Sequence, residues 1–208
     1  MSSKTLSQIS SLYVILPVLL IIFILSMILR YRQSRHAVFS IAEKLLLTGL
    51  SIGYLVLYAY LTLTYRRPAE QPQMNMSLFW SYYEALQIQD GALRIRRLGL
   101  ARQILLNILV MIPIGLLLPL IYHRYRHPLL LTALTGFALS VLTELLQYIT
   151  HLGLCELDDI LHNTLGCLIG ILLFWIGTRA MDRISRHRRI PESPDAAKTL
   201  PENEWEGT

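Results

Sequence analysis

The chain has 208 residues, of which 53% are hydrophobic and 16% charged, with a formal net charge of +5. Its mean hydropathy is +0.45 and its pI is about 9.4. Soluble domains average about 25% charged residues, so the composition excludes an ordinary soluble domain and predicts a membrane protein. A basic chain can bind nucleic acid, but here the basic residues lie in loops and a tail between apolar segments. That distribution is typical of membrane-flanking charge and argues against a nucleic-acid partner.

Five apolar segments approach the length needed to cross a membrane, which is about 20 residues. They cover residues 12–29, 45–65, 104–122, 129–150 and 160–178. Lipid offers no hydrogen-bond partners to open sheet edges, so we expect these segments to be helices. The predicted fold is therefore all-α, a polytopic membrane helix bundle with about five transmembrane helices. Pro17, Pro113 and Pro119 each predict a kink or a break within a span.

The spans divide the chain into three parts. Residues 1–11 form a short amino-terminal segment, and residues 12–178 form the transmembrane domain. Residues 179–208 form a tail that we expect to be disordered, since it is rich in charge and proline. The first apolar segment is longer than the apolar core of a signal peptide and lacks a small-x-small cleavage site, which predicts a retained span.

The distribution of lysine and arginine predicts the orientation. The 30–44 loop, the 123–128 loop and the segment after residue 178 carry twelve of these residues, against seven in the other segments outside the spans. Basic residues concentrate on the cytoplasmic side. We therefore expect the amino terminus outside and the carboxyl terminus in the cytoplasm. The 66–103 loop opposes this with six arginines, but long loops weigh less in the rule.

Within the 66–103 loop, residues 76–86 mix aromatic, apolar and polar side chains. Two interpretations stay open. The segment is either an interfacial helix at headgroup level or a loop packed on the bundle.

Several polar residues interrupt the apolar spans. An ionisable side chain in a membrane helix costs a few kcal/mol at least, so such residues are usually retained for a site. Those found here fall near the predicted outer ends of the third, fourth and fifth spans. The candidate functional cluster comprises Asn107, about one turn into its span, with Glu144, Gln147, Asp158, Asp159 and Asn163.

Residue spacing places most of these side chains on two helix faces. One face comprises Ser140, Glu144, Gln147 and His151, and the other comprises Asp159, Asn163, Gly166 and Gly170. The Gly-x-x-x-Gly pattern permits close helix packing. Because the loop between the fourth and fifth spans is short, we expect the fourth span to be the neighbour that these glycines contact. Pro113-Ile-Gly115 predicts a break in the third span.

Simpler structural roles stay open for some of the cluster. Asp158 or Asp159 could be the N-cap of the fifth helix. Gln147 and Asn163 could make interhelical hydrogen bonds with no other purpose. Glu144 has the weakest such explanation, because a carboxylate there must be paired, hydrated or protonated.

Metal binding by His151 or His162 with the nearby carboxylates is an alternative that no tight ligand motif supports. Cys155 and Cys167 show neither metal-ligand spacing nor a disulfide framework. We expect no metal and no cofactor.

One region carries a longer pattern. Asn107 is followed by Pro113-x-Gly115 and Glu144-x-x-Gln147, and then by Gly153-Leu-Cys-Glu-Leu-Asp158-Asp159-Ile-Leu-His-Asn163-Thr-Leu-Gly166-x-x-x-Gly170. In order and spacing, this region of about residues 102–175 resembles the VanZ-like family of bacterial membrane proteins. Some members carry an arginine in the loop between the fourth and fifth spans. This chain has none there, so any role of that arginine is absent or is taken by Arg66, Arg67 or Arg102.

The resemblance implies a multi-pass protein of the bacterial plasma membrane that is linked to reduced susceptibility to glycopeptide antibiotics such as teicoplanin. Three mechanisms stay open. The favoured one is not enzymatic: the polar cluster binds an amphiphile or a lipid-linked headgroup, or shields the membrane surface, with membrane lipids as partners. The second is an enzyme acting on a lipid or cell-wall precursor, with Glu144 as general base and Asp158 or Asp159 as its partner. The third is a structural subunit of an envelope complex.

Overall fold

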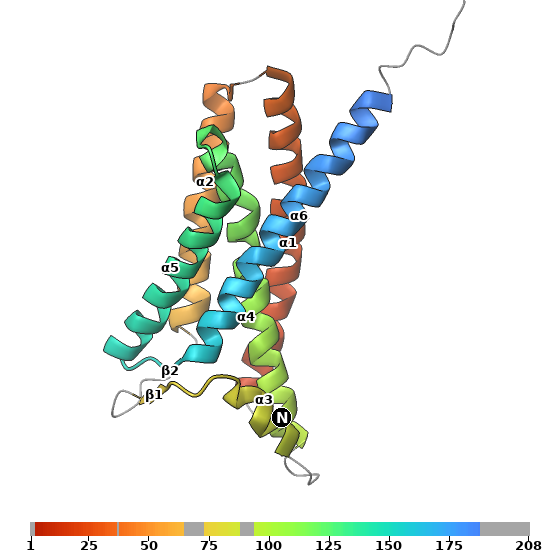
Figure 1. Ribbon diagram of the computed structural model, residues 1–208. Coiled ribbons are helices and arrows are strands. Elements are labelled where there is room, and N and C mark those ends of the chain that lie inside the picture. The colour runs from red at the N-terminus through yellow and green to blue at the C-terminus, as the bar shows by residue number, and fades with distance from the viewer. Residues whose placement is uncertain (1–2, 37, 65–72, 88–93, 188–208) are drawn as a thin grey trace, which may run out of the picture.

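The computed structural model describes residues 3–36, 38–64, 73–87 and 94–187. Five of its helices are long and apolar enough to cross a membrane, which confirms the predicted all-α bundle (Figure 1). These helices are α1 (Ser3–His36), α2 (Ile41–Ala59), α4 (Arg94–Ile121), α5 (Pro128–Ile149) and α6 (Leu157–His187). The shorter elements are the helix α3 (Trp80–Gln87) and the strands β1 (Gln73–Asn75) and β2 (Leu154–Glu156). A π-helical turn, Tyr60–Thr64, continues α2.

The helices extend beyond the predicted spans. Helix α4 begins at Arg94, so Asn107, about one turn inside the predicted span, lies more than three turns after the start of its helix. Helix α6 continues to His187, so the expectation of a disordered tail is wrong for residues 179–187. Residues 188–208 lie outside the described part of the chain. A helix satisfies its own backbone in water as well as in lipid, so an apolar segment marks a span but not the end of its helix.

The prolines do not end their helices. Pro17 lies inside α1, and Pro113 and Pro119 lie inside α4. The predicted break around Pro113 and Gly115 is therefore wrong. One turn before Pro113, the hydroxyl of Tyr54 in α2 donates a hydrogen bond to the Val110 carbonyl. Such contacts from neighbouring helices make proline tolerable within a span.

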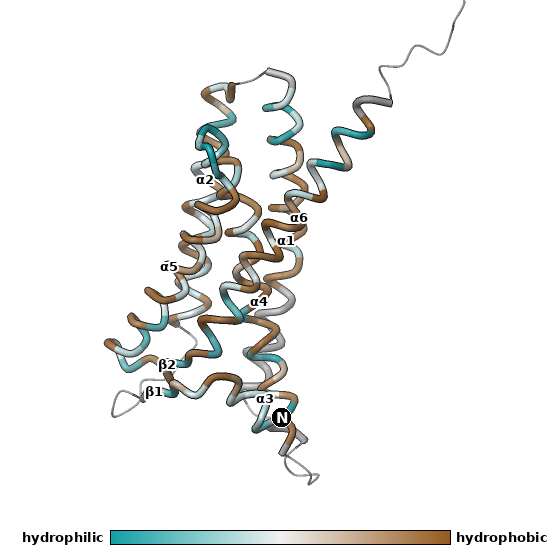
Figure 2. The backbone as a smooth tube through the Cα atoms, in the orientation of Figure 1, coloured by the Kyte–Doolittle hydropathy of each residue, from teal (hydrophilic) through white to brown (hydrophobic). Residues whose placement is uncertain are grey.

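Helix α4 is the centre of the bundle. It contacts α1, α2, α3, α5 and α6, and its residues 110–117 are buried almost without interruption. Hydrophobic residues predominate along much of the length of the outer helices (Figure 2). Leu16, Ile52 and Leu130 are examples of large apolar side chains that are more than half exposed. Such surfaces are unfavourable in water and are expected in lipid.

Close packing of α6 on α4 depends on glycine. A Cβ atom at Gly166 would collide with the carbonyl oxygen of Ile108, and one at Gly170 would collide with the carbonyl oxygen of Ile112. The predicted role of the two glycines is confirmed, but the neighbour is the third span and not the fourth. The contacts advance together along the two helices, so α4 and α6 run parallel. The short loop between α5 and α6 keeps the end of α5 near the start of α6. It does not determine which face of α6 packs against α5.

Helix α5 packs on α6 through other residues. Gly136 lies against the side chain of Cys167, and the Ser140 hydroxyl donates to the carbonyl of Ile160 at 3.3 Å. These contacts place the polar face of α5 beside the first turns of α6.

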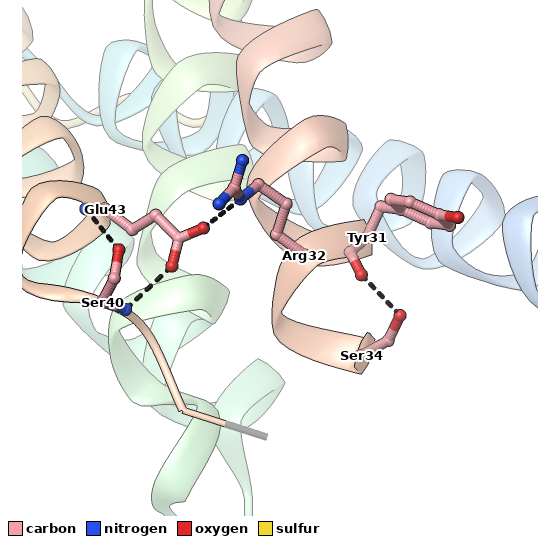
Figure 3. A network of polar contacts seen from close by, with 5 residues as sticks. All are labelled: Tyr31, Arg32, Ser34, Ser40 and Glu43. Atoms are coloured by element: carbon pink, nitrogen blue, oxygen red, sulfur yellow. Dashed lines mark hydrogen bonds and ion pairs between the residues drawn. The ribbon is translucent and has the colours of Figure 1, made fainter. Parts of the chain in front are cut away.

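The α1–α2 connection lies at the end of the bundle away from β1 and β2 (Figure 1). A capping box begins α2, because the Glu43 amide donates to the Ser40 hydroxyl at 3.3 Å and the Ser40 amide donates to the Glu43 carboxylate at 2.8 Å. Arg32 of α1 forms an ion pair with the same carboxylate (Figure 3). The Phe39 ring also packs edge-on against His123, with ring centroids 5.3 Å apart. These contacts join α1, α2 and the end of α4.

We predict that Gly166→Ala and Gly170→Ala each lower the thermal unfolding midpoint in detergent. Overpacking a close contact costs about 1–3 kcal/mol. Gly53→Ala is the matched control, because nothing lies within 4 Å of a Cβ atom at that position and alanine is the better helix former by about 1 kcal/mol. Equal midpoints for Gly166→Ala and Gly53→Ala would contradict the packing.

Candidate functional site

The strands join two loops that are far apart in sequence. Strand β1 pairs in parallel with β2, with Gln73 opposite Leu154 and Asn75 opposite Glu156. The pair lies at the end of the bundle where α5 ends and α6 begins (Figure 1). Strands of three residues carry too little periodicity to be predicted from sequence. Their pairing brings residues 73–87, which we name the covering segment, against the predicted polar cluster.

Asp158 attaches this covering segment to the bundle. Its buried carboxylate accepts hydrogen bonds from the Phe79 amide at 2.6 Å, the Ser81 amide at 3.1 Å and the Ser81 hydroxyl at 2.8 Å. Because α3 begins at Trp80, Asp158 caps α3 from another helix. A second contact joins Tyr82 Oη and His162 Nε2 at 2.9 Å. The part of the segment from Trp80 to Gln87 is thus a helix that packs on the bundle, and its position at headgroup level stays a prediction.

The prediction that Asp158 or Asp159 is the N-cap of its own helix is wrong. Helix α6 begins at Leu157, so both aspartates lie in its first turn. Their negative charge is still favourable there, because the amino-terminal end of a helix carries partial positive charge.

The polar face predicted for α5 is confirmed for three of its four residues. Ser140, Glu144 and Gln147 are all buried. The Gln147 side-chain amide donates to the carbonyl of Thr62 at 3.1 Å. That carbonyl belongs to the π-helical turn that continues α2. His151 lies beyond the end of α5 with a φ of 56°, so its assignment to this face is wrong.

Besides Asp158, three further buried carboxylates lie at this end of the bundle. Glu144, Glu156 and Asp159, which we name the carboxylate cluster, have exposed fractions of 2%, 4% and 1%. Glu144 accepts a hydrogen bond from the Glu156 amide at 3.0 Å. The side-chain amide nitrogen of Gln103 donates to Glu156 at 2.8 Å and lies 3.3 Å from Asp159. The cluster therefore combines groups from α4, α5, β2 and α6.

Gln103 and Glu156 are functional candidates that the sequence reasoning missed. Gln103 precedes the predicted third span, and Glu156 falls in a loop, so neither interrupts an apolar segment. A usable signal was present for Gln103, because it lies four residues before Asn107 and so shares its helix face.

Asn107 and Asn163 lie between two contacts that join α4 and α6. Gln103 contacts Asp159 toward the amino-terminal ends of the two helices. Ile108 contacts Gly166 toward their carboxyl-terminal ends. Asp159 and Asn163 are both buried, and the contacts of Asp159 and Gly166 with α4 place the helix face that they share toward α4. Polar pairs four residues apart thus face each other across parallel helices.

Some buried polar atoms of this region lack hydrogen-bond partners within the described part of the chain. They are Asn107 Nδ2, Gln147 Oε1, His162 Nδ1, Asn163 Oδ1 and Trp80 Nε1. Most buried polar groups in proteins are paired, so a group of exceptions at one end of a bundle needs an explanation.

The pKa of the Cys155 thiol reflects the negative charge of the site. Burial raises the pKa of the Cys155 thiol, and the negative charges of Glu144, Asp159 and Glu156 raise it further. A thiolate is disfavoured beside carboxylates because like charges repel. The thiol therefore lies within the electrostatic range of the whole carboxylate cluster.

The residues that the structure describes do not form a metal-binding site. No group of three His, Cys, Asp or Glu side chains there could hold a metal ion. His162 contacts Tyr82 through Nε2, and His151 lies outside the helices.

A family model described as VanZ/LLP1 matches residues 10–178. The chain belongs to the VanZ/LLP1 family. This confirms the resemblance and extends it beyond residues 102–175 to α1 and α2, where no family pattern was evident from the sequence. Comparisons with curated proteins and with solved structures found no match.

We predict that Asp158→Ala detaches the covering segment of this VanZ/LLP1 protein. Three hydrogen bonds to a charged group are lost, each contributing about 1.5–3 kcal/mol. Hydrogen–deuterium exchange of residues 73–87 should accelerate while exchange in α4 stays slow. Asp182→Ala is the control, because Asp182 is exposed on the same helix. Unchanged exchange in residues 73–87 would disprove this capping role.

The raised pKa of Cys155 predicts slow alkylation at neutral pH. In a Cys167→Ser background, the rate of alkylation should rise only above the pH at which an ordinary thiol reacts. Glu144→Gln removes one of the negative charges that raise this pKa, so it should move the midpoint of the rate profile to lower pH. A midpoint that does not move would show that Glu144 carries no charge near Cys155.

Proposed function

We propose that this protein lowers bacterial susceptibility to teicoplanin-type glycopeptides by binding an amphiphile or a lipid-linked headgroup, or by shielding the membrane surface. The observation that carries the proposal is the carboxylate cluster, which is buried at one end of a membrane bundle. Burying charge at a helix end in a membrane protein is costly. Three carboxylates are buried in this one site, which supports a role in recognition.

The surface of the covering segment supports an amphiphilic ligand. Its exposed apolar and aromatic side chains are Met74, Met76, Leu78, Phe79, Tyr82, Tyr83 and Leu86. Aromatic and apolar side chains of this kind are typical of the membrane–water interface. A headgroup at the carboxylate cluster would leave its apolar chains beside this surface and in the surrounding lipid.

The proposed location of the site is the outer leaflet of the plasma membrane. Helix α1 begins at the strand end of the bundle, and α6 ends at the opposite end (Figure 1). The loop after α4 carries Arg124 and Arg126 at that opposite end, together with Arg179 and Arg183 of α6. The positive-inside rule then supports an amino terminus outside and a carboxyl terminus in the cytoplasm.

The same carboxylates support a second candidate, an enzyme that modifies a lipid or cell-wall precursor. Glu144 contacts the backbone of Glu156, and neighbouring buried carboxylates can divide the roles of general acid and base. Mass spectrometry of lipids and wall precursors tests this candidate. A new covalent product that depends on Glu144 would support catalysis, and an unchanged inventory would support binding or shielding.

We predict that Glu144→Gln and Asp159→Asn abolish protection against teicoplanin in a susceptible bacterial host. Both replacements keep a carbonyl oxygen that can accept the hydrogen bonds from the Glu156 amide and from Gln103, so the fold should persist without the charge. The minimum inhibitory concentration measures the effect, and the amount of protein in the membrane fraction is compared in parallel.

Asp182→Asn is the matched control for this experiment, because it removes an exposed carboxylate from α6. It should leave protection unchanged. Full protection by both Glu144→Gln and Asp159→Asn would rule out the carboxylate cluster as the functional site.

A further inference from the structure

The carboxylate cluster is closed to solvent in this structure, since its three residues have exposed fractions of 4% or less. A molecule from outside reaches the cluster only after a neighbouring element moves. The helices α4, α5 and α6 are long and pack along the bundle. The covering segment instead contains a strand of three residues and a helix of eight. Elements with few buried contacts open at the lowest free energy, so the covering segment is the element most able to move.

Few groups hold the covering segment on the bundle. Strand β1 pairs with β2, and α3 packs on α4. Among the side chains of this segment whose burial is described, Ser81 is the buried one. Its amide and its hydroxyl both donate to Asp158, and the Phe79 amide donates to the same carboxylate at 2.6 Å. Asp158 is therefore the main point of attachment at the start of α3.

The backbone of Phe79 is strained while the segment is attached. Its φ is 61°, a conformation that is unfavourable for a residue with a Cβ atom. The Phe79 side chain is 48% exposed, and its ring lies against Tyr82 of the same segment. Packing of the ring on the bundle therefore does not maintain the conformation. The hydrogen bond from the Phe79 amide to Asp158 is the contact that maintains it.

Helix termination does not explain the conformation of Phe79, although it explains that of His151, whose φ is 56°. His151 follows the C-cap of α5, and the next amide, that of Leu152, donates to the Gln147 carbonyl at 3.0 Å. Helices commonly end in this way with a left-handed residue. Phe79 precedes a helix, where an extended backbone is normal. Strain of this kind is found at positions that change conformation during function.

We propose that the covering segment is a lid that opens at Asp158, and that the strained backbone of Phe79 favours opening. When the hydrogen bond to Asp158 breaks, φ of Phe79 can return to a negative value, so opening releases the strain. The open lid exposes Cys155 and Glu156, which lie opposite Met74 and Asn75 in the strand pair. This inference goes beyond the proposed function, because it concerns access to the site whatever the ligand.

A pair of variants, Phe79→Gly and Phe79→Ala, tests the strain. Both remove the ring, but only glycine adopts a φ of 61° without steric cost. The probe is the rate at which iodoacetamide alkylates Cys155 in the full-length protein in detergent, in a Cys167→Ser background. Cys155 is buried, so this rate follows the population of the open state. The glycine variant should react about three- to fivefold more slowly than the alanine variant, because the greater flexibility of glycine in the open state offsets part of the relief.

Tyr83 provides the matched control pair. It lies within α3 and its side chain is 63% exposed. Glycine is the poorer helix former there, so Tyr83→Gly should react faster than Tyr83→Ala, which is the opposite order. If Phe79→Gly reacts as fast as Phe79→Ala or faster, the role of strain is refuted.

Asp158→Asn tests the point of attachment. It removes the negative charge and one acceptor oxygen, so alkylation of Cys155 should accelerate roughly tenfold or more. Asp182→Asn, which changes an exposed carboxylate of the same helix, should leave the rate unchanged. Equal rates in the two variants would overturn the proposal. The Phe79 pair remains decisive if Asp158→Asn does not fold.

Hydrogen–deuterium exchange distinguishes opening of the lid from unfolding of the bundle. Exchange in residues 73–87 should change in parallel with alkylation across these variants, while exchange in residues 110–117 of α4 stays slow. Parallel changes in both regions would show global unfolding and overturn the lid. The measurements contain no antibiotic and no ligand, so failure of the lid leaves the proposed function untouched, and loss of the proposed function leaves the lid testable.

Discussion

The close contact between α4 and α6 is the constraint on which the site depends. At Gly166 and Gly170 the backbone of α6 approaches the Ile108 and Ile112 carbonyls so closely that a Cβ atom would collide with them. Without a strong hydrophobic force between helices in lipid, such packing of small residues is a main source of association. Because the two helices run parallel, the same approach continues toward their amino-terminal ends and brings Gln103 beside Asp159.

The buried charges are stable because fixed donors surround them. The Glu156 amide binds Glu144, the Gln103 amide lies between two carboxylates, and the backbone of the covering segment binds Asp158. Each donor comes from a different element than its acceptor. The site therefore exists only when α4, α5, α6 and the covering segment are assembled, and its loss should accompany any disruption of that end of the bundle.

Residue spacing predicted much of the site, and the reasons for its failures are physical. The shared face of Glu144 and Gln147 follows from helix periodicity, and so does that of Asp159 and Asn163. The wrong partner for Gly166 came from loop length, which limits the distance between helix ends but not the face that is covered. The sequence did not identify Gln103 and Glu156 because both lie outside the apolar segments. A polar side chain there has little free-energy cost, so its presence does not indicate a site.

The sequence by itself determined the five membrane helices, the polar faces and the membership of the VanZ/LLP1 family, because apolar length, periodicity and motif spacing are local properties of the chain. Only the tertiary structure decided that α6 packs on α4 and that β1 pairs with β2. It also decided that Asp158 caps a helix 77 residues away in sequence at Ser81 and that three carboxylates meet. The strand pairing, the close contacts of Gly166 and Gly170 and the capping by Asp158 all involve backbone groups. Every residue has these groups, so the side-chain pattern of the sequence does not identify the partner.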